Sequence, residues 1–347
     1  MEQYLTSIRG NQALRERLGE ELRSGLFPHA HIIEGASGFG KHLLATEIAM
    51  SLACESRTKA GTPLPCGTCR NCRRIKRGNC PDIITVSKGE RATMGVETIR
   101  TLREGLATVP NDLDVKIYII EDAHTMTVQA QNALLLTLEE PPSFVVFLLL
   151  AEDSGALLET VRSRAPTHRL QPIDRETMRD FLLTDTAARA AGAAGLATER
   201  PAEFEALLSL AAGSIGKALL LLDGEKRAPL IERISRVSEL VNCLLDRKAP
   251  DRLLLALQAL GTARDAVHAD LSMLQLALRD LLLLGRTEQA ALLFYTDTDA
   301  AAELATRFTG AGIFALSAAV DSALEALAAN ANVRLTIINL FNQLCTS

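Results

Sequence analysis

A glycine-rich loop between a β-type run and a helical run constrains the fold of this chain more than any other feature. The run His31–Glu34 (HIIE) leads into a loop that contains Gly35, Gly38, Gly40 and Lys41, and helical spacing begins directly afterwards. In such a strand–loop–helix unit, glycines let backbone N–H groups turn toward phosphate oxygens, while the helix N-terminus and the lysine add positive charge. The pattern predicts an α/β fold with a phosphate-binding loop. The alternative is a glycine-rich turn that holds no ligand.

Further β-type runs alternate with helical segments along the first half of the chain, which is typical of a parallel sheet covered by helices on both faces. The expected strands are His31–Glu34, Asp82–Val86, Val115–Ile120, Phe144–Leu150 and Thr167–Leu170. The expected helices between them are Leu43–Leu52, Val96–Ala107 and Thr127–Leu138. From Pro172 onward the chain is rich in Leu and Ala with helical periodicity only. The sequence therefore predicts an α/β core with a parallel five-stranded sheet, followed by all-α domains.

Three parts are expected along the chain. Residues 1–170 form the α/β core, with a cysteine-rich knuckle inserted at residues 54–80, and residues 171–225 form a small helical domain. Residues 226–347 form a larger helical domain. The boundary between the two helical domains is expected at the polar stretch Asp223–Pro229, which contains glycine and proline.

The charge balance and the apolar runs limit the function classes. Thirty-seven Lys and Arg against 42 Asp and Glu leave a formal charge of −5, which excludes a bulk electrostatic nucleic-acid binder. The longest apolar run, residues 144–151, has eight residues, whereas a membrane-crossing helix needs about 20. The first 15 residues lack a basic head followed by an apolar block. We expect no membrane association and a cytoplasmic location.

The phosphate-binding pattern departs from its usual form after Lys41. The next position normally holds Ser or Thr, whose hydroxyl oxygen binds magnesium, but His42 offers a nitrogen that magnesium accepts poorly. The glycines and Lys41 still predict nucleotide binding, whereas the missing hydroxyl argues against hydrolysis.

An acidic pair, Glu121-Asp122, follows the strand VKIYII. Phosphate-loop ATPases place here one acid that holds magnesium and a second that orients the attacking water. The usual order, Asp then Glu, is reversed. The expected nucleotide site is thus degenerate and consists of Gly35, Gly38, Gly40, Lys41, His42, Glu121 and Asp122. The alternative for the acidic pair is two solvated carboxylates at a strand end.

Three cysteines, Cys66, Cys69 and Cys72, follow one another at the spacing of a turn that wraps a tetrahedral zinc ion. Spacing alone leaves the fourth ligand open between Cys54 and Cys80. No open coordination position with a general base is evident, so the zinc is expected to be structural. Free thiols are the alternative. Basic residues are clustered in the same segment. We interpret them as a solvent-exposed face rather than as a DNA-binding surface.

These motifs together resemble the bacterial clamp-loader branch of the AAA+ ATPases. The resemblance covers residues 1 to about 220 and is carried by Gly10-Asn11-Gln12, PHAHIIEGASGFGKH, the cysteine knuckle, Cys80-Pro81-Asp82, KIYIIEDAHTM, Asn132–Leu135, Thr137–Pro142 and Ser163-Arg164. It implies an AAA+ core, a helical lid and a helical collar that oligomerises. It also implies zinc ligation by Cys54 together with Cys66, Cys69 and Cys72, which selects Cys54 over Cys80.

Within the family, departures from the motor pattern favour the delta prime type over the ATP-hydrolysing gamma/tau type. Besides His42 and the inverted acids, the stretch Leu150–Asp153 lacks the threonines of the first sensor, and Gly216 stands where motors place the second-sensor arginine. The family retains an arginine, here Arg164, that reaches the ATP site of a neighbouring subunit. Without the resemblance, Arg162 and Arg164 would be interpreted as ordinary surface charges.

The resemblance implies a stator-like subunit of a hetero-pentameric ring that contains gamma/tau and delta subunits and loads the sliding clamp on primed DNA. Its expected cofactors are a structural Zn²⁺ ion and ATP that is bound without hydrolysis. Two alternatives remain at this point: a gamma/tau-type motor subunit that hydrolyses ATP itself, and a zinc-bearing DNA-binding module with a steep salt dependence.

Overall fold

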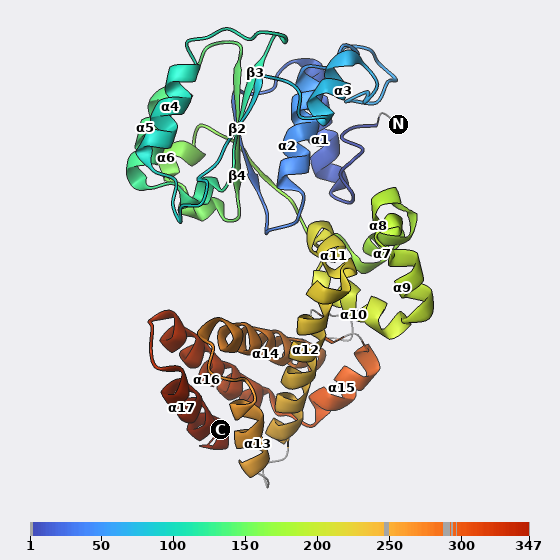
Figure 1. The fold of residues 1–347 in the computed structure, drawn as a ribbon, viewed down its shortest axis with the longest axis vertical. Helices are drawn as coiled ribbons and strands as arrows, with labels where there is room; N and C mark the ends of the chain where they lie inside the picture. Colours follow the sequence, from blue (N-terminus) through green and yellow to red (C-terminus); the bar gives the residue numbers. More distant parts are fainter. Residues whose placement is uncertain (1–2, 246–249, 287–291, 293, 296, 347) are drawn as a thin grey trace. The chain divides into compact units, whose positions relative to one another are not determined.

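The structure is a computed structural model that describes residues 3–245, 250–286, 292, 294–295 and 297–346. The chain divides into two compact units (Figure 1). The first comprises Met1–Phe181 together with Gly213–Lys217, and the second comprises Leu182–Ala212 and Ala218–Ser347. The division into three parts at residues 170 and 225 stays a prediction.

The first unit is built on a sheet of five parallel strands in the order β2-β3-β4-β1-β5. The strands are β1 (Ala30–Glu34), β2 (Ile83–Val86), β3 (Lys116–Ile120), β4 (Val145–Ala151) and β5 (Thr167–Arg169). The predicted α/β core with a parallel five-stranded sheet is confirmed. Because all strands run in one direction, the loops that follow β1, β2, β3 and β4 meet at one edge of the sheet, where ligands of open α/β sheets bind.

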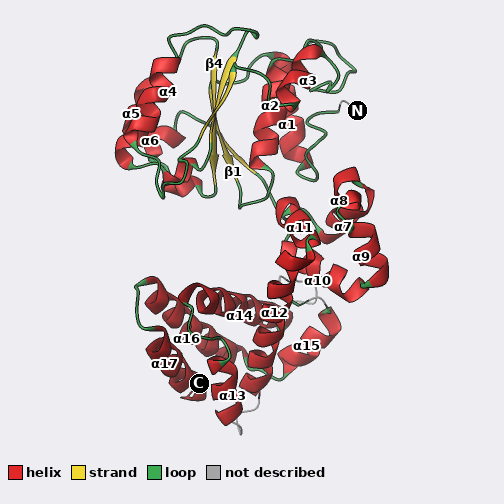
Figure 2. Ribbon diagram, viewed as in Figure 1, coloured by secondary structure: helices red, strands yellow, loops and turns green. Residues whose placement is uncertain are grey.

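Helices cover both faces of the sheet (Figures 1 and 2). One face carries α1 (Gln12–Ser24), α2 (Lys41–Leu52) and α3 (Arg70–Lys76), and the other carries α4 (Val96–Gly105), α5 (Val128–Glu139) and α6 (Glu159–Arg162). Two 3₁₀ turns, η1 (Ala123–Thr125) and η2 (Ser154–Ala156), follow β3 and β4.

The alternation of side chains along the central strands divides the apolar core into two layers. Ile33 of β1 packs with Leu18 and Ile48 of the α1–α2 layer, whereas the preceding residue, Ile32, packs with Leu134 of the α4–α5 layer. Successive strand residues point to opposite faces, and a parallel sheet buried on both faces therefore needs apolar residues at consecutive positions. This explains why β4 reads as a continuous apolar run with every residue buried.

From residue 175 onward, every described element is a helix, so the all-α C-terminal part is confirmed. The helices are α7 (Arg175–Thr184), α8 (Thr186–Ala190), α9 (Ala193–Glu199), α10 (Pro201–Ala211), α11 (Ile215–Leu222), α12 (Gly224–Leu245), α13 (Pro250–Gln258), α14 (Arg264–Leu284), α15 (Thr298–Thr306), α16 (Gly310–Ala328) and α17 (Val333–Thr346). Helices α12 to α17 share one apolar core around Leu240, Leu274 and Val320.

The polar stretch at residues 223–229 begins a helix. Asp223 accepts a hydrogen bond from the N–H of Glu225 at its Oδ1 and another from the N–H of Arg227 at its carbonyl oxygen, which is how an aspartate caps a helix N-terminus. Pro229 lies inside α12. The glycine and proline of this stretch therefore belong to the start of a 22-residue helix.

Among the described helices, α16 is the one that is long and apolar enough to span a membrane by length and composition. Its residues Ile313, Leu316 and Val320 are buried against the other helices of the second unit. Buried core helices of soluble proteins can have the same length and apolar composition, so the observation is weak evidence for a membrane span.

Candidate functional site

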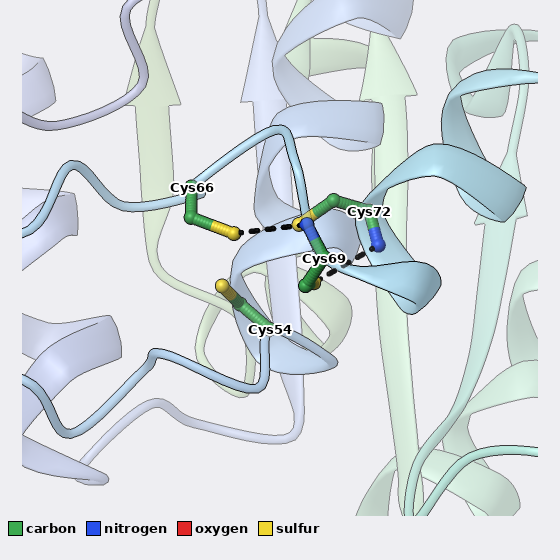
Figure 3. Close-up of side chains that lie close together, drawn as sticks. All are labelled: Cys54, Cys66, Cys69 and Cys72. Carbon is green, nitrogen blue, oxygen red and sulfur yellow. Dashed lines mark hydrogen bonds between the residues drawn. The ribbon is translucent and has the colours of Figure 1, made fainter.

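The four cysteines of the predicted zinc set lie together beside the C-terminal end of α2 (Figure 3). Cys54 follows α2, Cys66 and Cys69 lie in the loop before α3, and Cys72 lies in the first turn of α3. The Cys66 sulfur accepts a hydrogen bond from the N–H of Cys69, and the Cys69 sulfur accepts one from the N–H of Cys72, each across 3.4 Å. These N–H···S contacts fold the cysteine segment into a knuckle that turns its sulfurs inward.

The sulfur positions fit a tetrahedral zinc ion. All four Sγ atoms lie within 4.8 Å of one another, and a zinc–sulfur distance of about 2.3 Å implies sulfur–sulfur separations of about 3.8 Å. Burial raises the pKa of Cys54 and of Cys72. At Cys66, burial acts in the same direction, but N–H donation from Cys69 and Thr68 outweighs it and lowers the pKa to about 6. A bound cation would stabilise the buried thiolates that the protein alone does not.

Cys80, the other sequence candidate for the fourth ligand, is buried outside this group of four sulfurs. The geometry is therefore compatible with a structural zinc ion held by Cys54, Cys66, Cys69 and Cys72. The assignment of these four residues as ligands stays a prediction.

The predicted phosphate loop connects β1 to α2 and is held by a second segment of the same unit, residues 213–217. Gly38 and Gly40 have φ angles of 78° and 92°, which glycine adopts without strain. The Ser214 hydroxyl donates to the carbonyl oxygen of Ser37 across 3.3 Å, and the N–H of Gly216 donates to that of Gly38 across 3.0 Å. These contacts fix the loop through its carbonyl oxygens.

Gly216 packs directly on this loop. A Cβ atom at Gly216 would lie 2.9 Å from Gly38 Cα, and a Cβ atom at Gly38 would lie 2.4 Å from the Ser214 hydroxyl. The position where motor subunits are expected to carry the second-sensor arginine therefore has no room for a side chain in this conformation.

Lys41, the predicted phosphate-contacting lysine, folds back onto its own loop. Its Nζ donates to the carbonyl oxygens of Gly35 across 2.6 Å and of Ala36 across 3.2 Å. Partial burial lowers the pKa of Lys41, and the nearby carboxylates of Glu152 and Asp122 oppose this shift. The ammonium group is thus held by neutral acceptors.

The next residue, His42, contacts the first predicted acid. Its Nδ1 lies 3.0 Å from Glu121 Oε1, although the two residues are 79 positions apart. The second acid, Asp122, lies 3.5 Å from Lys88 Nζ through its Oδ2. The fold therefore brings Lys41, His42 and the acidic pair to one edge of the sheet. There, each acid contacts a basic side chain: Glu121 contacts His42, and Asp122 contacts Lys88.

These residues do not fit a magnesium ion. Magnesium requires near-octahedral oxygen coordination and keeps several of its waters. Here the position of the expected hydroxyl holds an imidazole nitrogen, and both carboxylates contact basic side chains of the protein. Lys88 was not identified from the sequence, although its place two residues after β2 on the ligand edge was a usable signal.

Arg164, the predicted trans-acting arginine, lies after α6 and is partly exposed. Its NH2 donates to Glu139 Oε1 across 2.7 Å, and its NH1 donates to the carbonyl oxygen of Thr160 across 3.0 Å. Glu139 is the last residue of α5. This glutamate belongs to one of the sequence motifs but was assigned no role from the sequence.

Residues 10–174 match the sequence model of the family described as "DNA polymerase III, delta subunit". The tau subunit of DNA polymerase III from Escherichia coli (strain K12) is 34% identical over 180 residues, which are 52% of this chain and 27% of that protein. The delta′ subunit from Bacillus subtilis (strain 168) is 36% identical over 155 residues, which are 45% of this chain and 46% of that protein. The chain thus matches less than half of the length of either relative.

Among solved structures, a DNA polymerase III gamma subunit-related protein from Thermotoga maritima is similar with a TM-score of 0.44 and 18% identity, covering 95% of this chain and 99% of that chain. The sequence matches confirm that residues 10–174 are related to subunits of DNA polymerase III.

Proposed function

We propose, starting from the relationship of residues 10–174 to subunits of DNA polymerase III, that this chain is a delta-prime-type subunit of a clamp loader. In this role it is a stator in a hetero-pentameric ring with gamma/tau and delta subunits in the cytoplasm. The ring opens the sliding clamp and loads it on primed DNA while neighbouring subunits consume the ATP.

The observation that carries this proposal is the imidazole of His42 at the position of the magnesium-binding hydroxyl, where its Nδ1 lies 3.0 Å from Glu121 Oε1. Magnesium accepts nitrogen ligands poorly, and the contact with His42, although weak at this exposure, turns the first acid toward that nitrogen. A chain with this defect has little hydrolysis of its own, so its contribution to an ATP-driven assembly comes from its surfaces and from groups that it presents to its neighbours.

Arg164 is the group that we assign to this contribution. Its guanidinium is partly exposed and held by a carboxylate and a carbonyl oxygen of its own chain, so it can exchange these acceptors for a phosphate group of an adjacent subunit. A positive charge supplied in trans stabilises the transferring phosphoryl group and is worth about 10³ to 10⁵ in turnover in GTPases.

Cys54, Cys66, Cys69 and Cys72 would hold a zinc ion that cross-links the end of α2 to the start of α3. Bound zinc supplies folding free energy and no chemistry at such a closed site.

The proposal is tested by ring membership. The chain is mixed with motor and delta subunits of a clamp loader, and the product is weighed by native mass spectrometry. One copy of this chain in a five-subunit assembly supports the proposal, and failure to enter any assembly refutes it.

A second candidate function is a gamma/tau-type motor that hydrolyses ATP itself. It is favoured by the intact Gly35, Gly40 and Lys41 and by the match to tau subunits, which extends over 180 residues. This candidate predicts that the purified chain hydrolyses ATP and that Lys41→Ala abolishes the activity. A purified chain without ATPase activity excludes it.

A further inference from the structure

We propose that the nucleotide site of this chain binds ATP without magnesium, with basic side chains of the protein in place of the metal ion. This inference goes beyond the proposed function: it rests on the nucleotide binding that the phosphate-loop pattern predicts, and it concerns the residues after β1, β2 and β3. It starts from the mismatch between these residues and a magnesium ion.

Donor chemistry gives the first reason. Magnesium demands oxygen ligands, and the residue that follows Lys41 normally supplies one of them. His42 supplies an imidazole nitrogen, which suits zinc or copper better than magnesium. Its Nδ1 lies at hydrogen-bond distance from Glu121 Oε1, so a magnesium ion would first have to break that contact.

Charge balance gives the second reason. In a working site, the magnesium ion offsets the two carboxylates that point at the phosphates. Here the Lys88 ammonium offsets Asp122 across 3.5 Å, and the His42 imidazole contacts Glu121 across 3.0 Å. The Asp122 carboxylate therefore has a positive partner in the protein itself, which lowers its repulsion of a triphosphate without a divalent cation.

The phosphate loop gives the third reason, because its shape is fixed by the protein itself. Ser214 and Gly216 donate to the carbonyl oxygens of Ser37 and Gly38. Lys41 donates to the carbonyl oxygens of Gly35 and Ala36. When a nucleotide binds, its ammonium group can donate to a phosphate oxygen instead. Neither arrangement requires a metal ion.

The test is isothermal titration calorimetry of the full chain with ATP, with and without added Mg²⁺. The metal-free buffer is prepared over a chelating resin, since a soluble chelator would compete for zinc at the cysteine cluster. For the natural chain, we expect the two dissociation constants to agree within about threefold, because no metal–protein contact is lost. Lys41→Ala should weaken binding in both buffers, which assigns the heat to this loop.

Two variants test the role of the His42–Glu121 pair. His42→Thr restores a hydroxyl and frees Glu121, so added Mg²⁺ should then tighten binding at least about tenfold, a change of about 1.4 kcal/mol. Glu121→Gln removes the carboxylate but keeps a hydrogen-bond acceptor, and its binding should stay indifferent to Mg²⁺. The matched control is His268→Thr on α14, an exposed histidine of the second unit.

Three results would overturn the inference. They are binding by the natural chain that weakens about tenfold or more without Mg²⁺, no ATP binding in either buffer, and a His42→Thr variant that remains indifferent to Mg²⁺. None of these results affects ring membership, which is measured on the assembled complex, so failure here and failure of the proposed function are distinguishable.

Discussion

The guanidinium of Arg164 donates to the Glu139 carboxylate across 2.7 Å within one chain. The side chains of this pair are 36% and 47% exposed, and ion pairs with such access to water contribute only about 0 to 1 kcal/mol. The contact therefore orients Arg164 without holding it tightly. Such a weak contact is compatible with the proposed role, in which Arg164 exchanges Glu139 for a phosphate group of a neighbouring subunit.

The first prediction concerns Glu139 as a positioning residue for Arg164. Glu139→Ala should lower the DNA-stimulated ATPase of a reconstituted clamp loader severalfold without changing its mass, because Arg164 keeps only the Thr160 carbonyl oxygen as an acceptor. Glu140→Ala, at the adjacent exposed glutamate, should leave turnover unchanged. The two residues act as a unit, so the double variant with Arg164→Ala should be no slower than Arg164→Ala alone. Additive losses would argue against this role.

The second prediction concerns the fourth zinc ligand. Cys54→Ser should lose zinc, measured per chain by elemental mass spectrometry, and should lower the melting temperature by at least about 5 °C, because metal binding contributes folding free energy. Cys80→Ser is the matched control, since both thiols are buried but Cys80 lies outside the four-sulfur group. Zinc retained in Cys54→Ser and lost in Cys80→Ser would reverse the assignment.

The third prediction concerns a buried histidine pair between β1 and β5. His31 Nδ1 lies 2.8 Å from His168 Nε2, His31 Nε2 lies 2.9 Å from the Pro28 carbonyl oxygen, and an Arg17 N–H points at His168 Nδ1 across 3.2 Å. A single proton arrangement satisfies these contacts, with both rings neutral. Burial is the largest cause that lowers the pKa of His31 to about 3 and that of His168 to about 4.

The unfolded chain, with histidine pKa values of 6.5, then binds more protons than the folded chain at mildly acidic pH. The free energy of unfolding should therefore fall as the pH drops from about 6.5 toward about 4. Replacing His168 with Gln should flatten this decline in urea titrations, whereas replacing the exposed His268 should not. Parallel pH curves for the natural chain and His168→Gln would refute the prediction.

The fourth prediction concerns the packing of Gly216 on the phosphate loop. Gly216→Ala places a methyl group 2.9 Å from Gly38 Cα, which should cost about 1 to 3 kcal/mol in the free energy of unfolding as an overpacked contact. Gly195, in the middle of α9, has open space where a Cβ atom would lie. Gly195→Ala should stabilise the protein by about 0.5 to 1 kcal/mol. Denaturant titrations of both variants measure these changes in the free energy of unfolding. An unchanged free energy in Gly216→Ala would contradict the prediction, because it would show that the loop can shift to accommodate the methyl group.

Local sequence patterns predicted the sheet closely, because strand burial and loop chemistry are encoded in neighbouring residues. The expected strand His31–Glu34 begins one residue earlier, at Ala30, and the strand expected to end at Leu150 extends to Ala151. The glycine and proline of residues 223–229 gave no indication of a helix, yet Asp223 caps one there and Pro229 lies inside it.

The contacts that decide the chemistry were harder to predict. Lys88 reaches Asp122 and Glu139 reaches Arg164 across long stretches of sequence, and no local pattern determines which charges meet after the strands have packed. Sequence reasoning identified most of the residues at this edge of the sheet. Their pairing required the structure.

In the proposed function, Arg164 acts on the ATP site of an adjacent subunit, while the chain's own nucleotide site does not hydrolyse ATP. The most direct measurement is the DNA-stimulated ATPase of a reconstituted clamp loader that carries Arg164→Ala, with Arg162→Ala, at another exposed arginine of the same segment, as the control. We predict that Arg164→Ala depresses turnover while the mass of the complex is unchanged, and that Arg162→Ala retains full turnover. Full turnover by the complex with Arg164→Ala would contradict the account.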